Sequence, residues 1–265
     1  IEGHLASPLR IGIAGLGFGA QAYVPIIRRL KDAQLCALAD GGSNSARDFA
    51  SSFLPTPHSY SNGRAMIEEG EIDCIIAAVP PMAQTELVQS ALKRGIAVLC
   101  EKPCGATLQE CAGLVALAEE GEVCAAAGLE YRYEAGIAGL IDLVRNGEIG
   151  AVTEISVVWR TRGGLNPNRL WSWRDDTTCG GGVLNEFCTH VFDYLPLLAG
   201  APIDRVRCTA RTIVTERPDK NGTMRPVLAP DDVEIEGVFE NGVSTKVNVS
   251  NASSERSGHH IKVQG

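Results

Sequence analysis

The first half of the chain alternates short apolar runs with amphipathic, helix-like segments, and this alternation constrains the fold more than any other feature of the sequence. Continuous apolar strands separated by helices are typical of a parallel sheet that helices cover on both faces. We therefore expect a doubly wound α/β domain over residues 8–127. Its expected strands span 9–14, 34–39, 74–79, 97–100 and 123–127, and helix-like segments at 82–94 and 107–120 lie among them.

After Gly128 the pattern changes to that of an α+β domain, which we place at residues 128–265. Helices and an irregular segment rich in Gly, Asn, Pro and Trp are followed by long alternating strands. These strands are expected to form an open, mostly antiparallel sheet. The expected helices span 133–146 and 183–199, the irregular segment 163–182, and the strands 153–160, 203–215, 231–239, 242–250 and 259–263.

The first expected strand ends in a glycine pattern typical of dinucleotide-binding domains. Gly15, Gly17 and Ala20 follow the spacing G-x-G-x-x-(G/A), and Asp40 ends the second apolar run. Such glycines allow a tight turn and let the backbone approach a pyrophosphate at a helix N-terminus, while the small third residue lets helix and strand pack closely. An aspartate at the second strand tip accepts hydrogen bonds from ribose hydroxyls and repels a 2′-phosphate. The pattern predicts NAD, although Arg47 keeps NADP open, and the alternative is an ordinary glycine turn beside a surface aspartate.

The charge balance of the chain argues against nucleic acid as a partner. Its 265 residues include 24 Lys and Arg against 32 Asp and Glu, which gives a formal net charge of −8. Binding to a phosphate backbone rests on clustered basic residues that release counterions. No stretch reaches the roughly 18 consecutive apolar residues of a membrane helix, and no charged segment is followed by an apolar run at the start of the given residues. We expect a cytoplasmic protein with no membrane and no nucleic-acid partner.

The nine cysteines follow neither a disulfide nor a metal-binding pattern. Their number is odd, no C-x-x-C pair occurs, and most have apolar neighbours. We expect reduced, largely buried thiols in a reducing compartment. Cys179, Cys188 and His190 come nearest to a metal cluster, but their spacing matches no usual zinc pattern, so no metal site is predicted.

Five motifs, in register from residue 9 to about residue 200, carry a resemblance to a known family. They are the glycine pattern at 15–20, Ala78-Val79-Pro80-Pro81, Glu101-Lys102-Pro103, and the stretches 128–133 and 180–193. Through them the chain resembles the glucose-fructose oxidoreductase, inositol dehydrogenase and rhizopine-catabolism (Gfo/Idh/MocA) family of oxidoreductases. The resemblance implies a Rossmann domain that holds NAD(P) and a second, open-faced sheet domain that forms the other wall of the active-site cleft. It leaves the substrate open, because members act on sugars, cyclitols, diols and pigments.

The resemblance also implies roles for individual residues. Lys102 matches the lysine that hydrogen-bonds the reacting oxygen in many members, and His190 matches the usual proton donor and acceptor. The positions close to the nicotinamide are matched by Pro80, Pro81, Glu101 and Pro103. The complete set expected to bind the cofactor is Gly15, Gly17, Phe18, Gly19, Ala20, Asp40, Val79, Pro80, Gln84, Glu101, Lys102, Pro103, Arg132 and Trp173.

Elementary chemistry is consistent with these roles. Oxidising an alcohol requires a base for the hydroxyl proton, a cation beside the negative charge that develops on oxygen, and a nearby hydride acceptor. Histidine, with an ordinary pKa of about 6.5, suits the proton transfer at neutral pH. On the expected helix Glu186, His190 and Asp193 share one face, so the carboxylates can fix the imidazole tautomer. A buried polar network that only ties down the helix is the alternative. We predict Lys102, His190 and Glu186 as the catalytic residues.

Several positions depart from the family pattern. Glu186 stands where many members have aspartate, Cys188 replaces a glycine, and Gln84 replaces a histidine. Glu130 stands where asparagine is common, although Arg132 is retained. These departures indicate a divergent branch rather than a typical inositol dehydrogenase.

Arginines and tryptophans crowd the segment that enters the expected cleft, at Arg160, Arg162, Arg169 and Arg174 and at Trp159, Trp171 and Trp173. Arginine forks bind carboxylates or phosphates, and tryptophan faces stack on sugar rings. We therefore predict that the substrate, or the cofactor phosphate, is anionic, as in a sugar acid or a nucleotide-linked sugar. Ion pairs with Asp175, Asp176 and surface acids are the alternative. The residues predicted to bind the substrate are Lys102, Arg160, Arg162, Glu186 and His190.

Three functions stay open at this point. The first is an NAD(P)-dependent oxidoreductase that acts on the CH–OH group of a sugar-like small molecule. The others are an NAD-dependent glycosidase that oxidises its sugar transiently, and a non-catalytic nucleotide-sensing regulator on the same fold. Retention of both Lys102 and His190 favours catalysis. By resemblance alone we expect a homo-oligomer, a dimer or tetramer, formed through the second-domain sheet. Family members usually continue with further strands and a closing helix, so we expect that the sequence to Gly265 is incomplete or that this branch has lost them.

Overall fold

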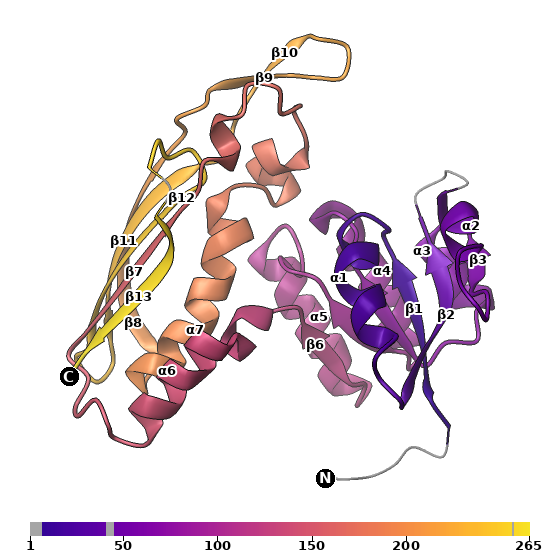
Figure 1. Ribbon diagram of the computed structural model, residues 1–265, viewed down its shortest axis with the longest axis horizontal. Helices are drawn as coiled ribbons and strands as arrows, with labels where there is room; N and C mark the ends of the chain where they lie inside the picture. The colour runs from indigo at the N-terminus through magenta and orange to yellow at the C-terminus, as the bar shows by residue number, and fades with distance from the viewer. Residues whose placement is uncertain (1–6, 41–44, 256) are drawn as a thin grey trace. The chain divides into compact units, whose positions relative to one another are not determined.

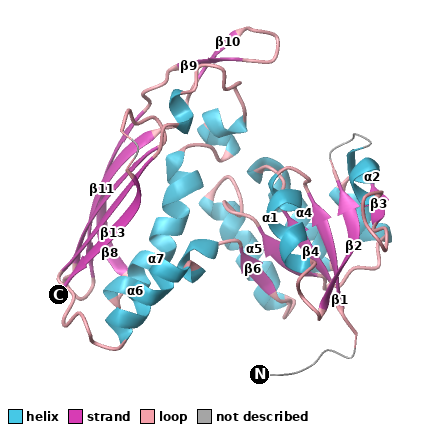
Figure 2. Cartoon of the chain, in the orientation of Figure 1, coloured by secondary structure: helices cyan, strands magenta, loops and turns pink. Residues whose placement is uncertain are grey.

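The computed structural model describes residues 7–40, 45–255 and 257–265. The chain divides into two compact units, one that ends at Gly128 and one that begins at Leu129 (Figure 1). Each unit has its own sheet and its own apolar core, and Figure 2 shows the helices and strands of both.

The first unit contains the parallel sheet expected from the sequence. Among the described residues its strands are β1 (Leu9–Ala14), β2 (Ala33–Ala39), β3 (His58–Tyr60), β4 (Cys74–Ala77), β5 (Ala97–Cys100) and β6 (Ala125–Ala127). They lie in the order β3-β2-β1-β4-β5-β6, and every neighbouring pair is parallel. This arrangement confirms the doubly wound α/β fold.

Helices cover both faces of this sheet. They are α1 (Phe18–Ile27), α2 (Ser45–Ala50), α3 (Gly63–Glu69), α4 (Pro81–Lys93) and α5 (Leu108–Glu120). Val24 of α1 and Ile13 of β1 share the core on one face. Leu87 of α4 and Ala77 of β4 share the core on the other face. Because the two cores use alternate residues of each strand, the strands are continuous apolar runs in the sequence.

The second unit is built on a mixed sheet. Its strands β7 (Glu154–Arg160), β8 (Ile203–Arg211), β11 (Asp232–Phe239), β12 (Ser244–Ser250) and β13 (Gly258–Gln264) lie in the order β13-β7-β12-β11-β8. Only the β7–β12 pair in this sheet of the described residues is parallel, so the predicted mostly antiparallel sheet is confirmed.

Helices α6 (Ala135–Arg145) and α7 (Thr189–Ala199) pack on one face of this mixed sheet (Figure 2). Ile141 of α6, Leu195 of α7 and Val157 of β7 belong to the same apolar core. The opposite face carries exposed polar side chains such as Glu236 and Lys246. The sheet therefore has one covered and one open face.

Short elements complete the second unit. They are the helical turns η1 (Glu130–Tyr133), η2 (Gly163–Leu165), η3 (Trp173–Asp175), η4 (Thr177–Cys179) and η5 (Leu184–Cys188), and the strands β9 (Glu216–Pro218) and β10 (Met224–Pro226). Strands β9 and β10 pair as an antiparallel hairpin.

Two expected elements of the second unit differ from the structure. The helix expected at 183–199 is a π-helical turn, η5, followed by α7, and the hydroxyl of Thr189 donates a 2.9 Å hydrogen bond to the backbone oxygen of Asn185 at this junction. The strand expected at 203–215 ends at Arg211. The chain leaves the sheet there because the carboxylate of Asp231 accepts the backbone N–H groups of the two residues that follow Thr212.

The cysteines are less buried than the sequence predicts. Cys100 and Cys188 are buried, whereas Cys124 and Cys208 are exposed. Apolar neighbours in sequence are a weak guide here, because Cys208 lies on the edge strand β8, whose residues are exposed almost throughout. The thiols thus include two that solvent reaches freely.

Candidate active site

The turn after β1 has the backbone geometry that a dinucleotide requires. Gly15 has φ of +95°, and a Cβ atom there would lie 2.3 Å from the backbone oxygen of Ala78, so only glycine fits. Gly17 precedes α1, and a Cβ atom on it would meet nothing within 4 Å, which leaves open space beside the helix N-terminus. The cradle fits a pyrophosphate that is bound by backbone N–H groups.

Gly19 is the residue that allows α1 to pack closely on the sheet. A Cβ atom there would lie 3.0 Å from side-chain atoms of both Ala78 and Ile13. Ala20, which the sequence analysis assigned to this role, is buried beside it, while the ring of Phe18 is half exposed. The small residues of the motif therefore have the expected kind of function, but the position that needs to be smallest is Gly19.

A hollow of about 400 Å³ lies at the carboxyl ends of β1 and β2, and Gly15, Asp40 and Val79 line it. The hydroxyl of Ser45 donates a hydrogen bond to the Asp40 carboxylate. Arg64 also lines the hollow, and its guanidinium lies 2.8 Å from Glu68 and 3.8 Å from Glu86. Arg47 is the basic residue expected here from the sequence, whereas the structure brings Arg64 to the hollow. The small residues after Asp40 lie outside the described residues.

Gln84 has a different role from the cofactor contact that the sequence predicted. Its side chain is 1% exposed, so a bound cofactor has no access to it. Its Nε2 donates hydrogen bonds to the backbone oxygens of Glu101 and Pro103, the second at 2.8 Å. Gln84 therefore fixes the backbone on both sides of Lys102.

The Glu101 carboxylate is fixed within the same unit. Tyr23 donates its hydroxyl to this carboxylate, and the backbone N–H of Lys102 donates a 3.1 Å hydrogen bond to it. Gly128 packs directly against it, since a Cβ atom there would lie 2.8 Å from Oε1 of Glu101. Tyr23 was missed in the sequence because a tyrosine on an amphipathic helix has no motif of its own.

His190 lies in the first turn of α7, directly after the π-helical turn, and only 2% of it is exposed. Its Nδ1 is 3.9 Å from Oε2 of Glu130. The ring of Tyr131 lies against the imidazole with 4.4 Å between ring centroids. Because π-helical turns are frequent at functional sites, this local irregularity agrees with a functional histidine.

Asp193, which was expected to lie beside His190 on one face of the helix, forms an ion pair with Arg132. Arg132 donates from Nε and Nη2 to the two carboxylate oxygens, the first at 2.6 Å. Hydrogen bonding to Asp193 raises the pKa of the Arg132 guanidinium. Arg132 was predicted to bind the cofactor, and the structure places it as a fixed, partly exposed cation.

Glu186 lies in the π-helical turn and is held by an arginine. Its Oε1 is 2.8 Å from Nε of Arg174, and its side chain is 14% exposed. The guanidinium of Arg174 lies over the ring of Trp173, 4.6 Å from the centroid. Trp173, predicted as a cofactor contact, thus supports the arginine that pairs with Glu186.

Arg160, which the sequence predicts to bind the substrate, lies on the other side of the sheet from His190. Ile155, Val157 and Trp159 of β7 are buried under the helices, so Arg160, one residue later, faces the open side of the sheet. There it donates to Asn248 at 2.6 Å. The structure therefore places Arg160 on the opposite sheet face from the helix that carries His190, because side chains alternate along a strand.

Arg162 and Arg169 lie beyond β7. Arg162 is exposed, and no acidic group within the described part of the chain pairs with it. Arg169 donates a 2.6 Å hydrogen bond to Asp175. For Arg169 the structure thus shows the ion pair that the sequence analysis offered as the alternative to ligand binding.

His259 joins the aromatic cluster around His190 and was not singled out in the sequence. Its ring stacks on Trp159 with 4.3 Å between centroids and 11° between planes. A 2.9 Å hydrogen bond joins its Nε2 to the hydroxyl of Tyr194. Burial, and to a lesser extent the nearby His260, lowers the pKa of His259 to about 4.

The described residues contain neither a metal-binding cluster nor a membrane-spanning helix. No group of three or more His, Cys, Asp or Glu side chains within them is arranged to hold a metal ion. No helix among residues 7–40, 45–255 and 257–265 has both the length and the apolar character to cross a membrane.

Comparison with known proteins relates both units to one family. Residues 9–129 match the GFO_IDH_MocA family, described as an oxidoreductase family with an NAD-binding Rossmann fold. Residues 137–265 match the GFO/IDH/MocA C-terminal domain. The chain is 30% identical over 261 residues to glucose-6-phosphate 3-dehydrogenase of Bacillus subtilis, and the match covers 97% of this chain and 72% of that protein.

Solved structures share the fold. The NAD-binding oxidoreductase of Klebsiella pneumoniae matches with a TM-score of 0.89 at 24% identity, over 98% of this chain and 71% of that one. A levoglucosan dehydrogenase in complex with NADH and L-sorbose matches with a TM-score of 0.88 at 23% identity, over 97% of this chain and 71% of that one.

Proposed function

The chain belongs to the GFO/IDH/MocA family of oxidoreductases, and on that basis we propose that it transfers hydride between NAD and a CH–OH group of a sugar-like alcohol or ketone. The observation that carries the proposal is the Gly15 cradle, because it excludes any side chain where a pyrophosphate requires bare backbone. Asp40 at the tip of β2 favours NAD over NADP, since its charge repels a 2′-phosphate.

Two side chains divide the chemistry in this proposal. His190 accepts the proton of the substrate hydroxyl in the oxidation and returns it in the reduction. The Nζ of Lys102 donates to the same oxygen and stabilises the negative charge that develops on it. NAD, when bound, supplies the hydride acceptor.

The surroundings of both residues support these roles. Gln84 and Glu101 hold the backbone and the turn around Lys102. The ring of Tyr131 packs against the imidazole of His190, and the Glu130 carboxylate lies 3.9 Å from its Nδ1. An orientation fixed before the substrate binds lowers the cost of reaching the reactive geometry. Glu186, paired with Arg174, is proposed to contact the substrate beside His190.

The substrate in this proposal carries a negative charge as well as hydroxyl groups. Glucose 6-phosphate is the substrate named for the Bacillus subtilis relative, so a phosphorylated sugar is the first to test. The experiment is an NADH absorbance and fluorescence screen of NAD and NADP against neutral sugars, sugar acids, sugar phosphates and cyclitols. Turnover of a sugar-like compound with NAD supports the proposal.

The same screen separates the two other candidate functions. An NAD-dependent glycosidase releases a free sugar without net formation of NADH. The Gly15 cradle also supports this function, because such an enzyme binds NAD. A nucleotide-sensing regulator binds NAD but turns over no sugar. Retention of Lys102 and His190 favours the dehydrogenase over the regulator.

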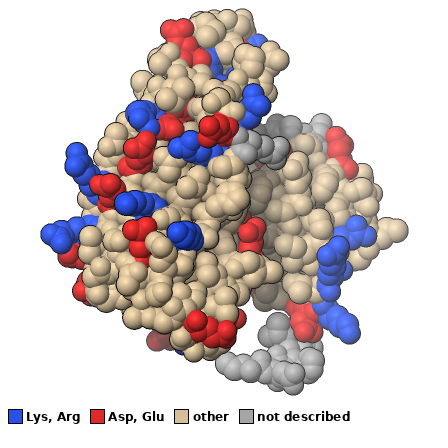
Figure 3. Space-filling view, turned by 60° about the vertical axis from the view of Figure 1, so that its left-hand side comes forward, with Lys and Arg blue, Asp and Glu red and all other residues tan. Residues whose placement is uncertain are grey.

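We also propose that two or four copies of the chain assemble through the open face of the mixed sheet. A hollow of about 460 Å³ on this face is lined by Arg207, Glu236 and Lys246, among others. Figure 3 shows basic and acidic side chains interspersed over the surface turned to the viewer. Such a face can pair with a second copy by opposite charges. Sedimentation equilibrium tests this assembly, which a monomer at micromolar concentration contradicts.

A further inference from the structure

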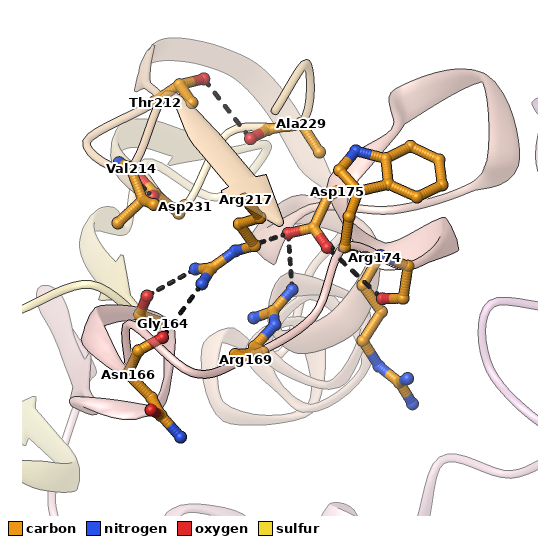
Figure 4. A network of polar contacts seen from close by, with 12 residues as sticks. Gly164, Asn166, Arg169, Arg174, Asp175, Thr212, Val214, Arg217, Ala229 and Asp231 are labelled. Atoms are coloured by element: carbon orange, nitrogen blue, oxygen red, sulfur yellow. Dashed lines mark hydrogen bonds and ion pairs between the residues drawn. The ribbon is translucent and has the colours of Figure 1, made fainter. Parts of the chain in front are cut away.

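Two arginines converge on one buried carboxylate in the second unit. Oδ1 of Asp175 accepts hydrogen bonds from Nη2 of Arg169 at 2.6 Å and from Nε of Arg217 at 3.1 Å (Figure 4). The other carboxylate oxygen accepts the backbone N–H of Ser172 at 2.9 Å. Only 3% of the Asp175 side chain and 4% of the Arg217 side chain are exposed. One carboxylate thus faces two guanidinium groups.

Arg217 is fixed in place by neutral acceptors. Its Nη1 donates to the backbone oxygen of Asn166 at 3.3 Å, and its Nη2 donates to that of Gly164 (Figure 4). These carbonyl groups accept hydrogen bonds from the Arg217 guanidinium, but they carry no negative charge to balance its positive charge. Arg217 belongs to β9, so this contact also fixes the hairpin to the segment around η2.

Part of the Arg169 guanidinium is available to bind a ligand. Its Nη2 is bound to Asp175, while no other N–H group of its guanidinium finds an acceptor within the part of the chain that the structure describes. About a quarter of its side chain is exposed. An arginine held by one nitrogen, with a free edge, can still bind an anion through two parallel hydrogen bonds.

The free edge of Arg169 belongs to a hollow of about 460 Å³ within this unit. Arg174 and Glu186 line the same hollow, together with polar groups of Ser172 and Asn251. Arg174 and Glu186 neutralise each other at 2.8 Å. Asp175 and Arg217 do not line the hollow, but Asp175 binds Arg169 and Arg217 binds Asp175. Counted together, three guanidinium groups stand against two carboxylates, which leaves one positive charge in a chain whose net charge is −8.

A positive charge that is partly withdrawn from water is costly unless an anion or a hydrogen-bond acceptor compensates it. We propose that this hollow is a subsite for the anionic group of the substrate, a phosphate or carboxylate on a sugar, and that Arg169 is its principal ligand. Asp175 and Arg217 are positioning residues that hold Arg169 in place. The inference rests on the proposed function, because the hollow reaches Glu186 in the turn before His190.

The proposed subsite assigns binding of the anionic group to a different residue from those that the sequence predicted. The sequence drew attention to Arg160 and Arg162, but Arg160 faces the open side of the sheet and Arg162 does not line the hollow. Asp175 was considered there only as a partner that would cancel an arginine. The second guanidinium, from Arg217, changes that balance because one carboxylate cannot cancel two cations.

The test uses the full chain with NADH and three related ligands: glucose 6-phosphate, glucuronate and glucose. Binding is measured by isothermal titration calorimetry, and NADH is used because it cannot accept hydride from a sugar hydroxyl, so the heat reports binding and not oxidation. We expect at least one anionic ligand to bind more tightly than glucose, and we expect Arg169→Gln to weaken that binding by about tenfold to a hundredfold while glucose binding stays the same. Arg169→Lys should retain part of the preference, because it keeps the charge but loses the fork.

Arg145→Gln is the matched control, since Arg145 is exposed at the end of α6 and lies outside the hollow. Melting temperatures of all variants show whether the second unit stays folded. Preference for glucose 6-phosphate identifies a phosphate subsite, and preference for glucuronate identifies a carboxylate subsite. Equal binding of all three ligands, or unchanged binding in Arg169→Gln, overturns the proposal. Tight binding of an anionic sugar without hydride transfer rejects the proposed dehydrogenase and leaves the subsite standing.

Discussion

The side-chain amide of Gln84 donates a 2.8 Å hydrogen bond to the backbone oxygen of Pro103, the residue that follows Lys102. A second hydrogen bond from the same nitrogen reaches the backbone oxygen of Glu101, the residue that precedes Lys102. Helix α4 therefore fixes the turn that presents the lysine. Among the described residues, the backbone hydrogen bonds of the sheet do not fix both ends of this turn in the same way.

Replacing Gln84 by leucine removes both hydrogen bonds at nearly constant volume. Two buried carbonyl groups then lose their donor, so we expect the free energy of unfolding to fall by about 1–3 kcal/mol. The Lys102 turn should also become less ordered, so that kcat falls while the Kd for NAD changes little. Urea denaturation and steady-state kinetics measure the two effects. Gln109→Leu, an exposed glutamine on α5, is the control and should leave both unchanged.

Replacing Asp40 by alanine removes the charge at the tip of β2. NAD should then bind about tenfold more weakly, because its ribose hydroxyls lose a charged acceptor, and NADP should bind more tightly because the repulsion is gone. Fluorescence titration with NADH and NADPH gives both affinities. Asp48→Ala on α2, exposed and outside the hollow, should preserve the original preference. An unchanged ratio of the two affinities in Asp40→Ala would show that another group selects the cofactor.

Replacing Asp193 by asparagine breaks the ion pair with Arg132. Asp193 is 7% exposed while Arg132 is 35% exposed, so solvent can still reach the arginine. We therefore expect a loss of about 1–3 kcal/mol in the free energy of unfolding, below the full cost of breaking a buried pair. Chemical denaturation measures it, with Asp142→Asn on α6 as an exposed control. A variant as stable as the parent would mean that the pair contributes only orientation.

His259 should make stability depend on pH. Its pKa is lowered from 6.5 to about 4 in the folded chain, mainly by burial. Between these values the unfolded chain binds the proton and the folded chain does not, so the free energy of unfolding falls as the pH falls from 6.5 to 4. Because His259 is only partly buried, we expect its share to be on the order of 1 kcal/mol.

His259→Gln should remove that share of the pH dependence, whereas the exposed His58→Gln should not. Urea denaturation curves at several pH values between 4 and 7 measure it. Identical slopes in the parent and in His259→Gln would exclude the histidine as a source of the effect.

The first unit could be predicted closely because its signals are local. The Gly15 turn requires a positive φ that the motif already implies, and each buried strand is a continuous apolar run. Strand β3 was missed because its three residues, His58 to Tyr60, are partly exposed and carry no apolar run. The change of role at Gln84 was also invisible, since only the fold shows that its amide meets the backbone of a distant turn.

The second unit could be predicted only in outline, because its site depends on contacts that are remote in sequence. Arg217 lies 42 residues after Asp175, and nothing in either segment indicates that they meet. The π-helical turn before His190 has no sequence signature either. One error was avoidable, since the alternation of Ile155, Val157 and Trp159 on β7 already places Arg160 on the opposite face.

In the proposed reaction His190 transfers the proton and Lys102 stabilises the charge that develops during hydride transfer to NAD. The most direct test compares kcat with the Kd for NAD in Lys102→Ala, His190→Ala and the parent, using the best sugar from the NADH screen. We predict that each substitution lowers kcat by about a hundredfold or more, while the Kd for NAD changes less than about threefold. Turnover at the parental rate in both variants, with NAD still bound, would contradict the account.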